Sequence, residues 1–372
     1  MRHSVAGWVP TPSSQGQKSG PGYLMSSEYT IATYNCENLF SRPGIFEESD
    51  AKSRELLAMV DQLKAELKKP VFDHDEISRL SRALSKYATI VDIRGKAASA
   101  KGAAEWLGYV SLDKVCLDDA SAKNIARVIA DTDADIISLI EIEDRLTLKG
   151  FHHDILYPEF LKPEGKEPYP YLMCIQGNDG RGINVAVMSR VPIRWMQSHV
   201  HELTEKNTPL FSRDCLEVNF ALSPDASLHL LINHFKSMGY SSGNDPQGNR
   251  RRLAQARRVA ELLGGHDLGR EYVVVAGDFN SPPTSPSLAP LLDNENMYNV
   301  NEELPKGRRG TYRTGKDQLD YILVSDALRK NIRDVRIERK GIYTPRGEKY
   351  ETVTNRRTEA SDHAAVVATV NV

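Results

Sequence analysis

The hydrophobic positions of this chain predict amphipathic helices in two stretches of its first hundred residues. In residues 54–69 and 77–91, apolar side chains recur every three or four positions and therefore share one helical face. They are Leu56, Leu57, Val60, Leu63 and Leu67 in the first stretch, and Ile77, Leu80, Leu84, Tyr87 and Val91 in the second. Because Pro70 and an acidic segment separate the two stretches, we expect a helical hairpin. Further helices are predicted over residues 117–135 and 247–265.

Short apolar runs predict the strands of the chain. They lie at residues 29–40, 135–143, 171–176, 183–189, 215–222, 228–235, 271–280, 318–326, 331–338 and 363–372. Helices separate some of these strands but not others. This alternation favours an α/β fold in which two mixed β-sheets pack face to face and are flanked by helices.

Composition and charge exclude several classes of protein. The 372 residues are 40% hydrophobic and 26% charged, as in ordinary globular chains, and the net charge of −2 gives no overall attraction to a polyanion. The four cysteines form no CxxC pair, which argues against a zinc site or a disulfide framework. No apolar run is long enough for a membrane span. Residues 1–26 lack a secretory apolar region and are interpreted as a flexible tail, so we expect a cytoplasmic protein.

Several predicted strands have polar side chains at one end. The polar pairs are Asn35 with Glu37, Asn233 with His234, Asp278 with Asn280, and Asp362 with His363; Glu141 stands alone near the end of its strand. A single polar strand end is most simply a turn or a cap. Five ends of such similar chemistry are harder to explain in this way. If the strands share sheets, these ends can converge in one cleft.

The residue types at these strand ends suit one kind of chemistry. Glu37, Glu141 and Asp362 offer the oxygen ligands that Mg²⁺ or Mn²⁺ requires. His234 and His363 can transfer protons and stabilise charge. The two asparagines are neutral donors that can orient a phosphoryl oxygen or a water, and no serine or cysteine nucleophile is needed. The set suits metal-assisted attack of water on a phosphate ester.

The ordered motifs TYNCENLF, DIISLIEIED, INHFKS, AGDFNSPP, QLDYILVS and SDHAAV resemble those of the endonuclease/exonuclease/phosphatase superfamily. The resemblance extends from about residue 30 to residue 372. It implies a four-layer α/β sandwich and a phosphoric ester hydrolase that depends on Mg²⁺ or Mn²⁺. It also implies a single catalytic domain over residues 27–372. Members of minimal size have one helix between the first two motifs, so residues from about 45 to 110 are interpreted as a helical insertion. It could form a wall or lid that narrows access beside the first catalytic strand, or it could simply pack at the periphery of the fold.

The resemblance implies a role for each residue of the site. Glu37, Glu141 and Asp362 would bind the metal, and Asn35 would lie near both metal and substrate. His234 and Asn280 would bind the scissile phosphate, and Asn280 could instead hold the water. Asp278 would orient or deprotonate that water. Asp320 would fix the tautomer of His363, which would transfer a proton or contact phosphate. Arg181 and Arg213 resemble arginines that approach the substrate, although each could equally form a structural salt bridge.

The class of substrate is less closely determined. Basic clusters occur at residues 250–258 and 306–313, and Arg356 and Arg357 stand just before the final motif. Such clusters favour a nuclease acting on DNA or RNA, unless they are merely solvated surface charge. The alternative is a phosphatase or phosphodiesterase of a small phosphorylated molecule or phospholipid. A non-catalytic binding protein fits poorly because no expected catalytic position is missing, and no obligatory protein partner is evident.

Three other motifs are interpreted as coincidental. GTYRTGK at residues 310–316 matches a nucleotide-binding loop, but Asp317 replaces the required Ser or Thr and a strand follows instead of a helix. GYSSG at residues 239–243 matches the GxSxG elbow without an adjoining strand and helix. His152 and His153 have no third ligand at a suitable spacing and are interpreted as surface residues.

Overall fold

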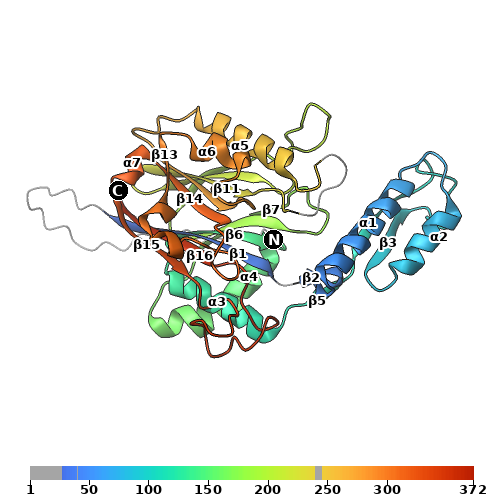
Figure 1. Ribbon diagram of the computed structural model, residues 1–372, viewed down its shortest axis with the longest axis horizontal. Coiled ribbons are helices and arrows are strands. Elements are labelled where there is room, and N and C mark those ends of the chain that lie inside the picture. The colour runs from blue at the N-terminus through green and yellow to red at the C-terminus, as the bar shows by residue number, and fades with distance from the viewer. Residues whose placement is uncertain (1–26, 40, 239–244) are drawn as a thin grey trace, which may run out of the picture.

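The computed structural model describes residues 27–39, 41–238 and 245–372 (Figure 1). The predicted tail at residues 1–26 and the GYSSG stretch lie outside these residues. None of the helices in the described part of the chain is long and apolar enough to span a membrane.

Two six-stranded mixed sheets form the centre of the molecule (Figure 1). The first has the order β15 (Ile332–Glu338), β16 (Ala365–Asn371), β1 (Glu28–Leu39), β6 (Ile136–Ile142), β8 (Asn184–Ser189) and β7 (Tyr171–Ile175). The second has the order β13 (Met297–Asn299), β14 (Asp320–Ser325), β12 (Tyr272–Asp278), β11 (Ser227–His234), β10 (Cys215–Ala221) and β9 (Ile193–Ser198). Only β1–β6 and β11–β12 pair in parallel within these two sheets. The predicted α/β sandwich is therefore confirmed.

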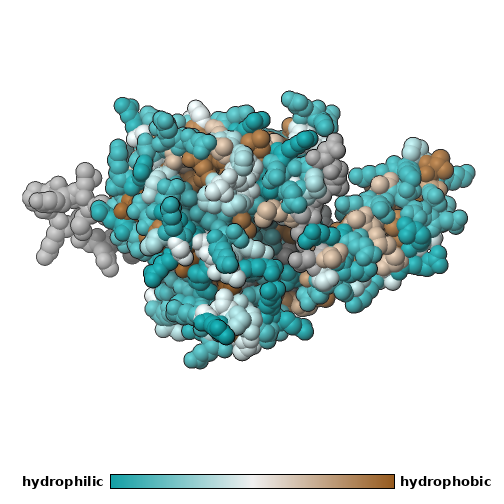
Figure 2. Space-filling view, in the orientation of Figure 1, coloured by the Kyte–Doolittle hydropathy of each residue, from teal (hydrophilic) through white to brown (hydrophobic). Residues whose placement is uncertain are grey.

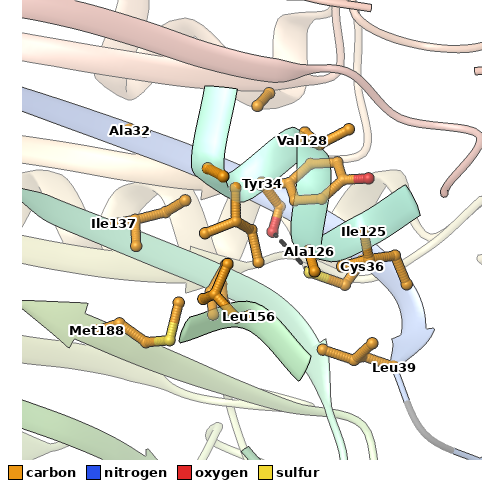
Figure 3. Packing of buried hydrophobic residues seen from close by; sticks show 14 of the residues in the cluster. Ala32, Tyr34, Cys36, Leu39, Ile125, Ala126, Val128, Ile137, Leu156 and Met188 are labelled. Carbon is orange, nitrogen blue, oxygen red and sulfur yellow. Dashed lines mark hydrogen bonds between the residues drawn. The ribbon is translucent and has the colours of Figure 1, made fainter. Parts of the chain in front are cut away.

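Side-chain alternation builds three apolar layers from these strands. Ile31 of β1 points toward the second sheet and Val274 of β12 points toward the first, so both lie in the central layer. Tyr34 and Val275 point outward into the two outer layers. On the outer side of the first sheet, α3 (Asp119–Thr132) packs over the strands, as Figure 3 shows for Tyr34 and its neighbours. On the outer side of the second sheet, α5 (Asn249–Leu263) and α6 (Ala289–Leu292) cover the strands. The helices supply the two outer layers of the sandwich.

Shorter helices complete the sandwich. They are α4 (Arg145–Phe151), the π-helical segment His152–Leu161, α7 (Asp326–Arg329) and the 3₁₀ turns Gly44–Glu47, Lys162–Glu164, Pro286–Leu288, Val300–Glu303 and Lys306–Arg308. The sequence patterns did not predict α4, the π-helical segment or β9. The assignment of His152 to the surface is wrong: this residue is 5% exposed, and its Nε2 atom accepts a hydrogen bond from the Tyr169 backbone N–H.

The segment interpreted as an insertion forms a small α/β unit beside the sandwich, seen in blue to cyan in Figure 1. It consists of α1 (Asp50–Glu66), α2 (His74–Ala83), β3 (Ala88–Arg94) and β4 (Leu107–Leu112), and it has an apolar cluster of its own. At its base, β2 (Ser41–Pro43) pairs with β5 (Lys114–Cys116). Figure 2 shows apolar side chains on the insertion more openly than on the visible face of the sandwich.

The predicted helix over residues 77–91 is only partly correct. Helix α2 ends at Ala83, and residues 88–94 instead form β3, which pairs antiparallel with β4. Thr89, Ile90 and Val91 are β-branched, so a strand suits them better than a helix does. The helical hairpin is therefore followed by a β-hairpin that the apolar spacing did not reveal.

Candidate active site

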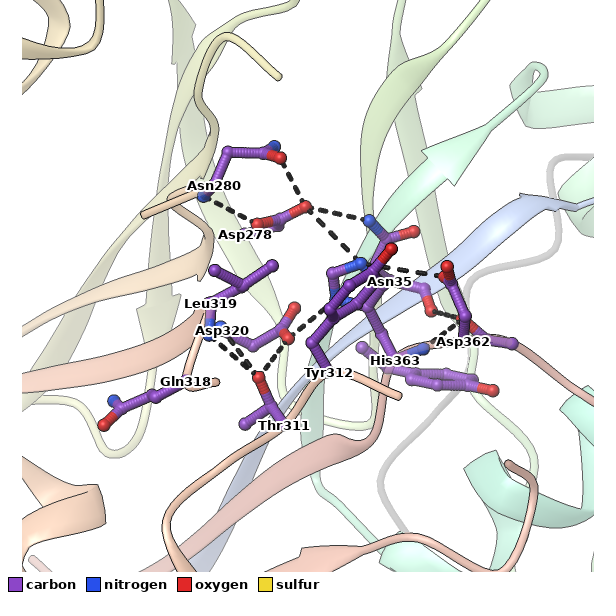
Figure 4. A network of polar contacts seen from close by, with 12 residues as sticks. Asn35, Asp278, Asn280, Thr311, Tyr312, Gln318, Leu319, Asp320, Asp362 and His363 are labelled. Carbon is purple, nitrogen blue, oxygen red and sulfur yellow. Dashed lines mark hydrogen bonds and ion pairs between the residues drawn. The ribbon is translucent and has the colours of Figure 1, made fainter. Parts of the chain in front are cut away.

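The predicted site residues meet at one edge of the sandwich (Figure 4). Parallel pairing brings the C-terminal ends of β1 and β6 together, and likewise those of β11 and β12. The antiparallel strands β14 and β16 begin at the same edge. These ends surround a cavity of about 290 Å³. Its lining includes every predicted site residue except Asp320, which lies behind His363.

Side-chain alternation directs four of these residues into the space between the sheets. His234 continues the central stripe of β11, and Asp278 continues that of β12, beyond the last apolar residue of each. Asn35 and Asp320 do the same on β1 and β14. The central apolar layer thus ends in a polar layer at the cavity.

Glu141 reaches the cavity through an irregularity in its strand. By alternation it would face the outer layer with Leu139, but its φ angle of 66° coincides with a shift in the pairing of β6. Glu37 and Asn280 also have positive φ angles, of 49° and 50°. Such conformations are uncommon for residues other than glycine, and bulges often redirect side chains at functional sites.

Asp278 is held by three amide donors. Its Oδ2 atom accepts hydrogen bonds from Asn35 Nδ2 at 3.0 Å and Asn280 Nδ2 at 3.1 Å. Its Oδ1 atom accepts from the Asn280 backbone N–H at 2.8 Å. Burial raises the pKa of Asp278 to about 7. The carboxyl group is therefore fixed in orientation, although none of these donors is charged.

His363 is anchored by Asp320. Its Nδ1 atom lies 2.8 Å from Asp320 Oδ2, which also accepts a hydrogen bond from Thr311 Oγ1 at 2.6 Å. Its Nε2 atom faces the cavity, 4.0 Å from Asp278 Oδ2 and 3.8 Å from Asp362 Oδ1. Burial disfavours the charged ring, but the carboxylates of Asp320 and Asp278 outweigh it and raise the pKa of His363 well above its usual range.

His234 has a different environment. Its Nε2 atom lies 3.7 Å from Glu141 Oε1 and 3.7 Å from Asp278 Oδ2, and neither ring nitrogen has a hydrogen-bond partner among the described residues. Burial, followed by the positive charges of Arg213 and Arg181, lowers the pKa of His234 well below its usual range. A buried imidazole without partners is costly, and a ligand in the cavity could supply the missing hydrogen bond.

The three predicted metal ligands line the cavity without forming a compact cluster. Ligand atoms of Asp278, Asp320 and His363 lie within 4.8 Å of one another, whereas those of Glu37, Glu141 and Asp362 do not form so tight a group. Mg²⁺ usually keeps several of its waters and binds few protein carboxylates directly, so wide spacing fits this ion.

Charge in this part of the cavity also fits a cation. Burial, together with the nearby Asp362 carboxylate, raises the pKa of Glu37 above its usual range. Glu37 Oε1 pairs with Arg42 at 2.7 Å, and Asp362 Oδ2 lies 3.4 Å from Arg313 Nε. The crowding of acids therefore persists despite two arginines, and a divalent cation would relieve it.

Arg181 and Arg213 both line the cavity, and both bind Asp179. The Asp179 Oδ2 atom lies 2.6 Å from Arg181 Nη2 and 3.0 Å from Arg213 Nε. Arg213 is 1% exposed and also donates to the Phe235 carbonyl. The two predicted alternatives, substrate contact and structural salt bridge, are thus compatible.

The polar strand ends did not point to several residues of the lining, although Arg313 belongs to the basic cluster predicted at residues 306–313. Arg42 and Phe46 come from the entry to the insertion, and Arg54 comes from α1. Tyr312 and Arg313 come from the GTYRTGK stretch. The ring centre of Tyr312 lies 4.9 Å from the ring centre of His363. Arg42 lies in the short strand β2, which no apolar run predicted, and the others lie outside the named strands, so the pattern of polar strand ends could not reveal them.

Comparison with known proteins agrees with this architecture. A sequence model of the Endonuclease/Exonuclease/phosphatase family matches residues 109–363. This chain belongs to that family. Its members are phosphoester hydrolases that typically use divalent metals. The resemblance seen in the ordered motifs is therefore confirmed, and most of the insertion precedes the matched residues.

Solved structures support the family fold. An endonuclease/exonuclease/phosphatase from Bacteroides vulgatus has a TM-score of 0.51 and 11% identity, covering 92% of this chain and 98% of its own. A family protein from Bacteroides thetaiotaomicron has a TM-score of 0.50 and 14% identity, covering 93% and 98%. No curated protein matches the sequence significantly.

Proposed function

We propose that this family member hydrolyses phosphodiester bonds in nucleic acid, by attack of water and with Mg²⁺ or Mn²⁺ bound. The observation that carries the proposal is the convergence of Asp278, His234 and the Asp320–His363 pair on one cavity. These groups provide a site for water, donors for phosphate and a route for a proton. No side-chain nucleophile is needed for such a reaction.

Asp278 would orient the attacking water and accept its proton. Asn35 and Asn280 already hold both carboxylate oxygens, so the carboxylate would present its remaining lone pair in a fixed direction. Fixed orientation of the acceptor reduces the reorganisation needed in the transition state.

The two histidines would act on the phosphate. His234 would donate a hydrogen bond to a phosphoryl oxygen, thereby gaining the partner that its buried ring lacks. His363, with its Nδ1–H directed to Asp320, would contact the phosphate or the leaving oxygen through Nε2. Arg213 and Arg181 would add positive charge close to the developing negative charge.

Glu37, Glu141 and Asp362 would hold the divalent cation, with Asn35 close by. A bound cation supplies Lewis-acid stabilisation of phosphoryl charge. The three acids would hold the cation at the end of the cavity where Arg42 and Arg313 also lie.

Arginines around the cavity favour nucleic acid over a small ester. Five of them line the cavity itself: Arg42, Arg54, Arg181, Arg213 and Arg313. A small phosphorylated molecule or a phospholipid headgroup remains the alternative substrate class, since the catalytic groups would serve it equally well.

The proposal is tested with purified protein and Mg²⁺ on plasmid DNA, single-stranded DNA, RNA, bis-p-nitrophenyl phosphate and p-nitrophenyl phosphate. We expect cleavage of the diesters, and loss of turnover in Asp278→Ala and His363→Ala proteins that retain their circular dichroism spectra. Full activity in both variants would reject the mechanism. Cleavage of the monoester alone would replace the nuclease with a phosphatase.

A further inference from the structure

A second cavity opens from the active site along the insertion. It has a volume of about 520 Å³ and lies between α1 and the sandwich. On one side it is lined by α1 from Arg54 to Lys64, and on the other by residues 178–181 together with Lys236 and Arg251. We call it the α1 cavity. Arg54 and Arg181 line both this cavity and the active site, so the two spaces adjoin.

Positive charge dominates the α1 cavity. Five basic residues line it, Arg54, Lys64, Arg181, Lys236 and Arg251, against the two acids Asp61 and Asp179. One of those acids is already engaged, because Asp179 bridges Arg181 and Arg213. The lining therefore carries a net positive charge that its own carboxylates do not balance.

Lys236 and Arg251 form the core side of the cavity. Burial, followed by the positive charges of Arg213 and Arg181, lowers the pKa of Lys236 to about 8. Arg251 donates to the backbone carbonyls of Pro209 and Leu210, so its charge is held in place without a carboxylate. Basic groups gathered on one side of a cavity are suited to an anion.

The side of the cavity formed by α1 lies close to the opposite side, formed by the sandwich. The Lys64 Nζ atom lies 3.7 Å from the position that a Cβ atom on Gly180 would occupy, so α1 reaches the loop that carries Arg181. Arg54 stands nearer the catalytic end, where it lines both cavities. Helix α1 belongs to the segment interpreted as the insertion, so this segment supplies one side of the α1 cavity.

The opening on the other side of the active site is different. It is lined by four arginines, Arg42, Arg313, Arg356 and Arg357, and by six acids, Glu37, Glu47, Glu48, Asp118, Glu359 and Asp362. Its charge is therefore mixed, although it includes the two arginines that the sequence suggested for a polyanion. The lining of the α1 cavity is therefore mainly positive, whereas the opening on the other side of the active site carries charges of both signs.

We propose that the α1 cavity binds the phosphodiester backbone next to the scissile phosphate, so that the insertion gives the enzyme a preference for polymeric nucleic acid. This inference rests on the proposed function and specifies its substrate. Arg54 and Lys64 contact backbone phosphates from one side of the strand, and Lys236 and Arg251 contact them from the other. A mononucleotide or a small ester fills the catalytic cavity but leaves this subsite empty.

The test compares two double variants of α1 and its C-terminal end. Arg54→Glu/Lys64→Glu reverses both charges on the insertion side of the subsite. Lys52→Glu/Lys68→Glu makes the same change in net charge at residues that line none of the described cavities. Lys52 pairs with Glu55 at the surface, and Lys68 is exposed. Melting curves confirm that both variants fold.

Binding is measured by fluorescence anisotropy with a labelled single strand of about 20 nucleotides in EDTA, over a range of salt concentrations. We expect the Arg54/Lys64 variant to bind more than tenfold more weakly. Its slope of log affinity against log salt should fall by about 1.4, since each lost phosphate contact removes about 0.7 for single strands. The Lys52/Lys68 variant should retain the slope of the unaltered protein.

Turnover separates this inference from the proposed function. We expect kcat/KM on the oligonucleotide to fall at least tenfold further than kcat/KM on bis-p-nitrophenyl phosphate in the Arg54/Lys64 variant. Equal losses on both substrates, or equal salt slopes in the two variants, would overturn the α1 subsite. Absence of hydrolysis of every diester by the unaltered protein would instead overturn the proposed function, and the anisotropy measurement would still decide the subsite.

Discussion

The Nδ1 atom of His363 lies 2.8 Å from Oδ2 of Asp320, at the inner end of the cavity. The same oxygen accepts the hydroxyl hydrogen of Thr311 at 2.6 Å. A carboxylate that accepts from Nδ1–H fixes the imidazole tautomer and leaves Nε2 to face the substrate. Asp320 does not line the cavity, so we infer that it acts through His363.

Replacing Asp320 by Asn should separate orientation from charge. An amide keeps the size of the side chain, but it can offer its NH₂ group to Nδ1 and stabilise the wrong tautomer. We expect kcat on a diester to fall roughly 10²- to 10⁴-fold, the range attributed to a positioned acid–base group, with little change in KM. The measurement is steady-state kinetics on bis-p-nitrophenyl phosphate.

Thr311→Val is the matched control for this variant. It removes the second donor to Asp320 and the acceptor of the Leu319 and Asp320 backbone N–H groups, but it leaves the carboxylate in place. Its effect on kcat should therefore be clearly smaller, and urea unfolding shows that the variant folds. If Asp320→Asn and Thr311→Val proved equally impaired, the tautomer argument would fail and Asp320 would be a packing residue.

We expect hydrolysis to depend on a metal ion that the acids lining the cavity bind. EDTA should abolish hydrolysis, and Mg²⁺ or Mn²⁺ should restore it. Glu141→Gln should raise the Mg²⁺ concentration for half-maximal activity by at least roughly tenfold. Glu143→Gln is the control, because Glu143 pairs with Lys114 and does not line the cavity. Activity that survives EDTA, or identical Mg²⁺ curves for both variants, would contradict the assignment.

The sequence indicated which polar residues would meet at the cavity more clearly than it indicated the structure of the segment beside it. Asn35 lies near the end of a buried strand, and His234 and Asp278 are the last residues of theirs, so their polar character broke an apolar pattern that was easy to recognise. In the folded protein, the register of the sheets brings these three residues together. By contrast, Arg54 lies on an exposed face of α1, where a charged residue is ordinary, and only the packing of the insertion beside the cleft gives it a position near the site.

The errors in secondary structure have a similar cause. Leu84 and Tyr87 continue the helical spacing of α2, yet both residues pack in the insertion core after the helix has ended. Spacing alone cannot distinguish a helix from a turn that buries the same side chains. His152 was misplaced for a related reason, since a polar ring buried by tertiary packing has no local signal.

Gly277 precedes Asp278 and is required by the approach of β11. Its φ angle is 135°, and a Cβ atom would lie 1.9 Å from the Asn233 carbonyl oxygen. We therefore expect Gly277→Ala to lower the free energy of unfolding by about 2–4 kcal/mol and to displace Asp278. Gly307→Ala is the control, because a Cβ atom there meets nothing within 4 Å. Urea unfolding measures the stability of both variants. Equal stability would show that β11 and β12 can move apart at no cost to admit the Cβ atom.

Acid should destabilise the protein partly through His152, far from the site. Its Nε2 atom accepts from the Tyr169 N–H, which requires the neutral ring, and burial lowers its pKa from 6.5 to about 4. Between these two values the unfolded chain binds a proton that the folded chain does not, so stability falls as pH falls from 6.5 toward 4. At 1.36 kcal/mol per pH unit, lowering the pH from 7 to 5 should cost about 2 kcal/mol through this residue. His152→Gln should lose that part of the pH dependence in urea unfolding, whereas exposed His153→Gln should keep most of it. Identical pH dependence in both variants would mean that folding does not lower the pKa of His152.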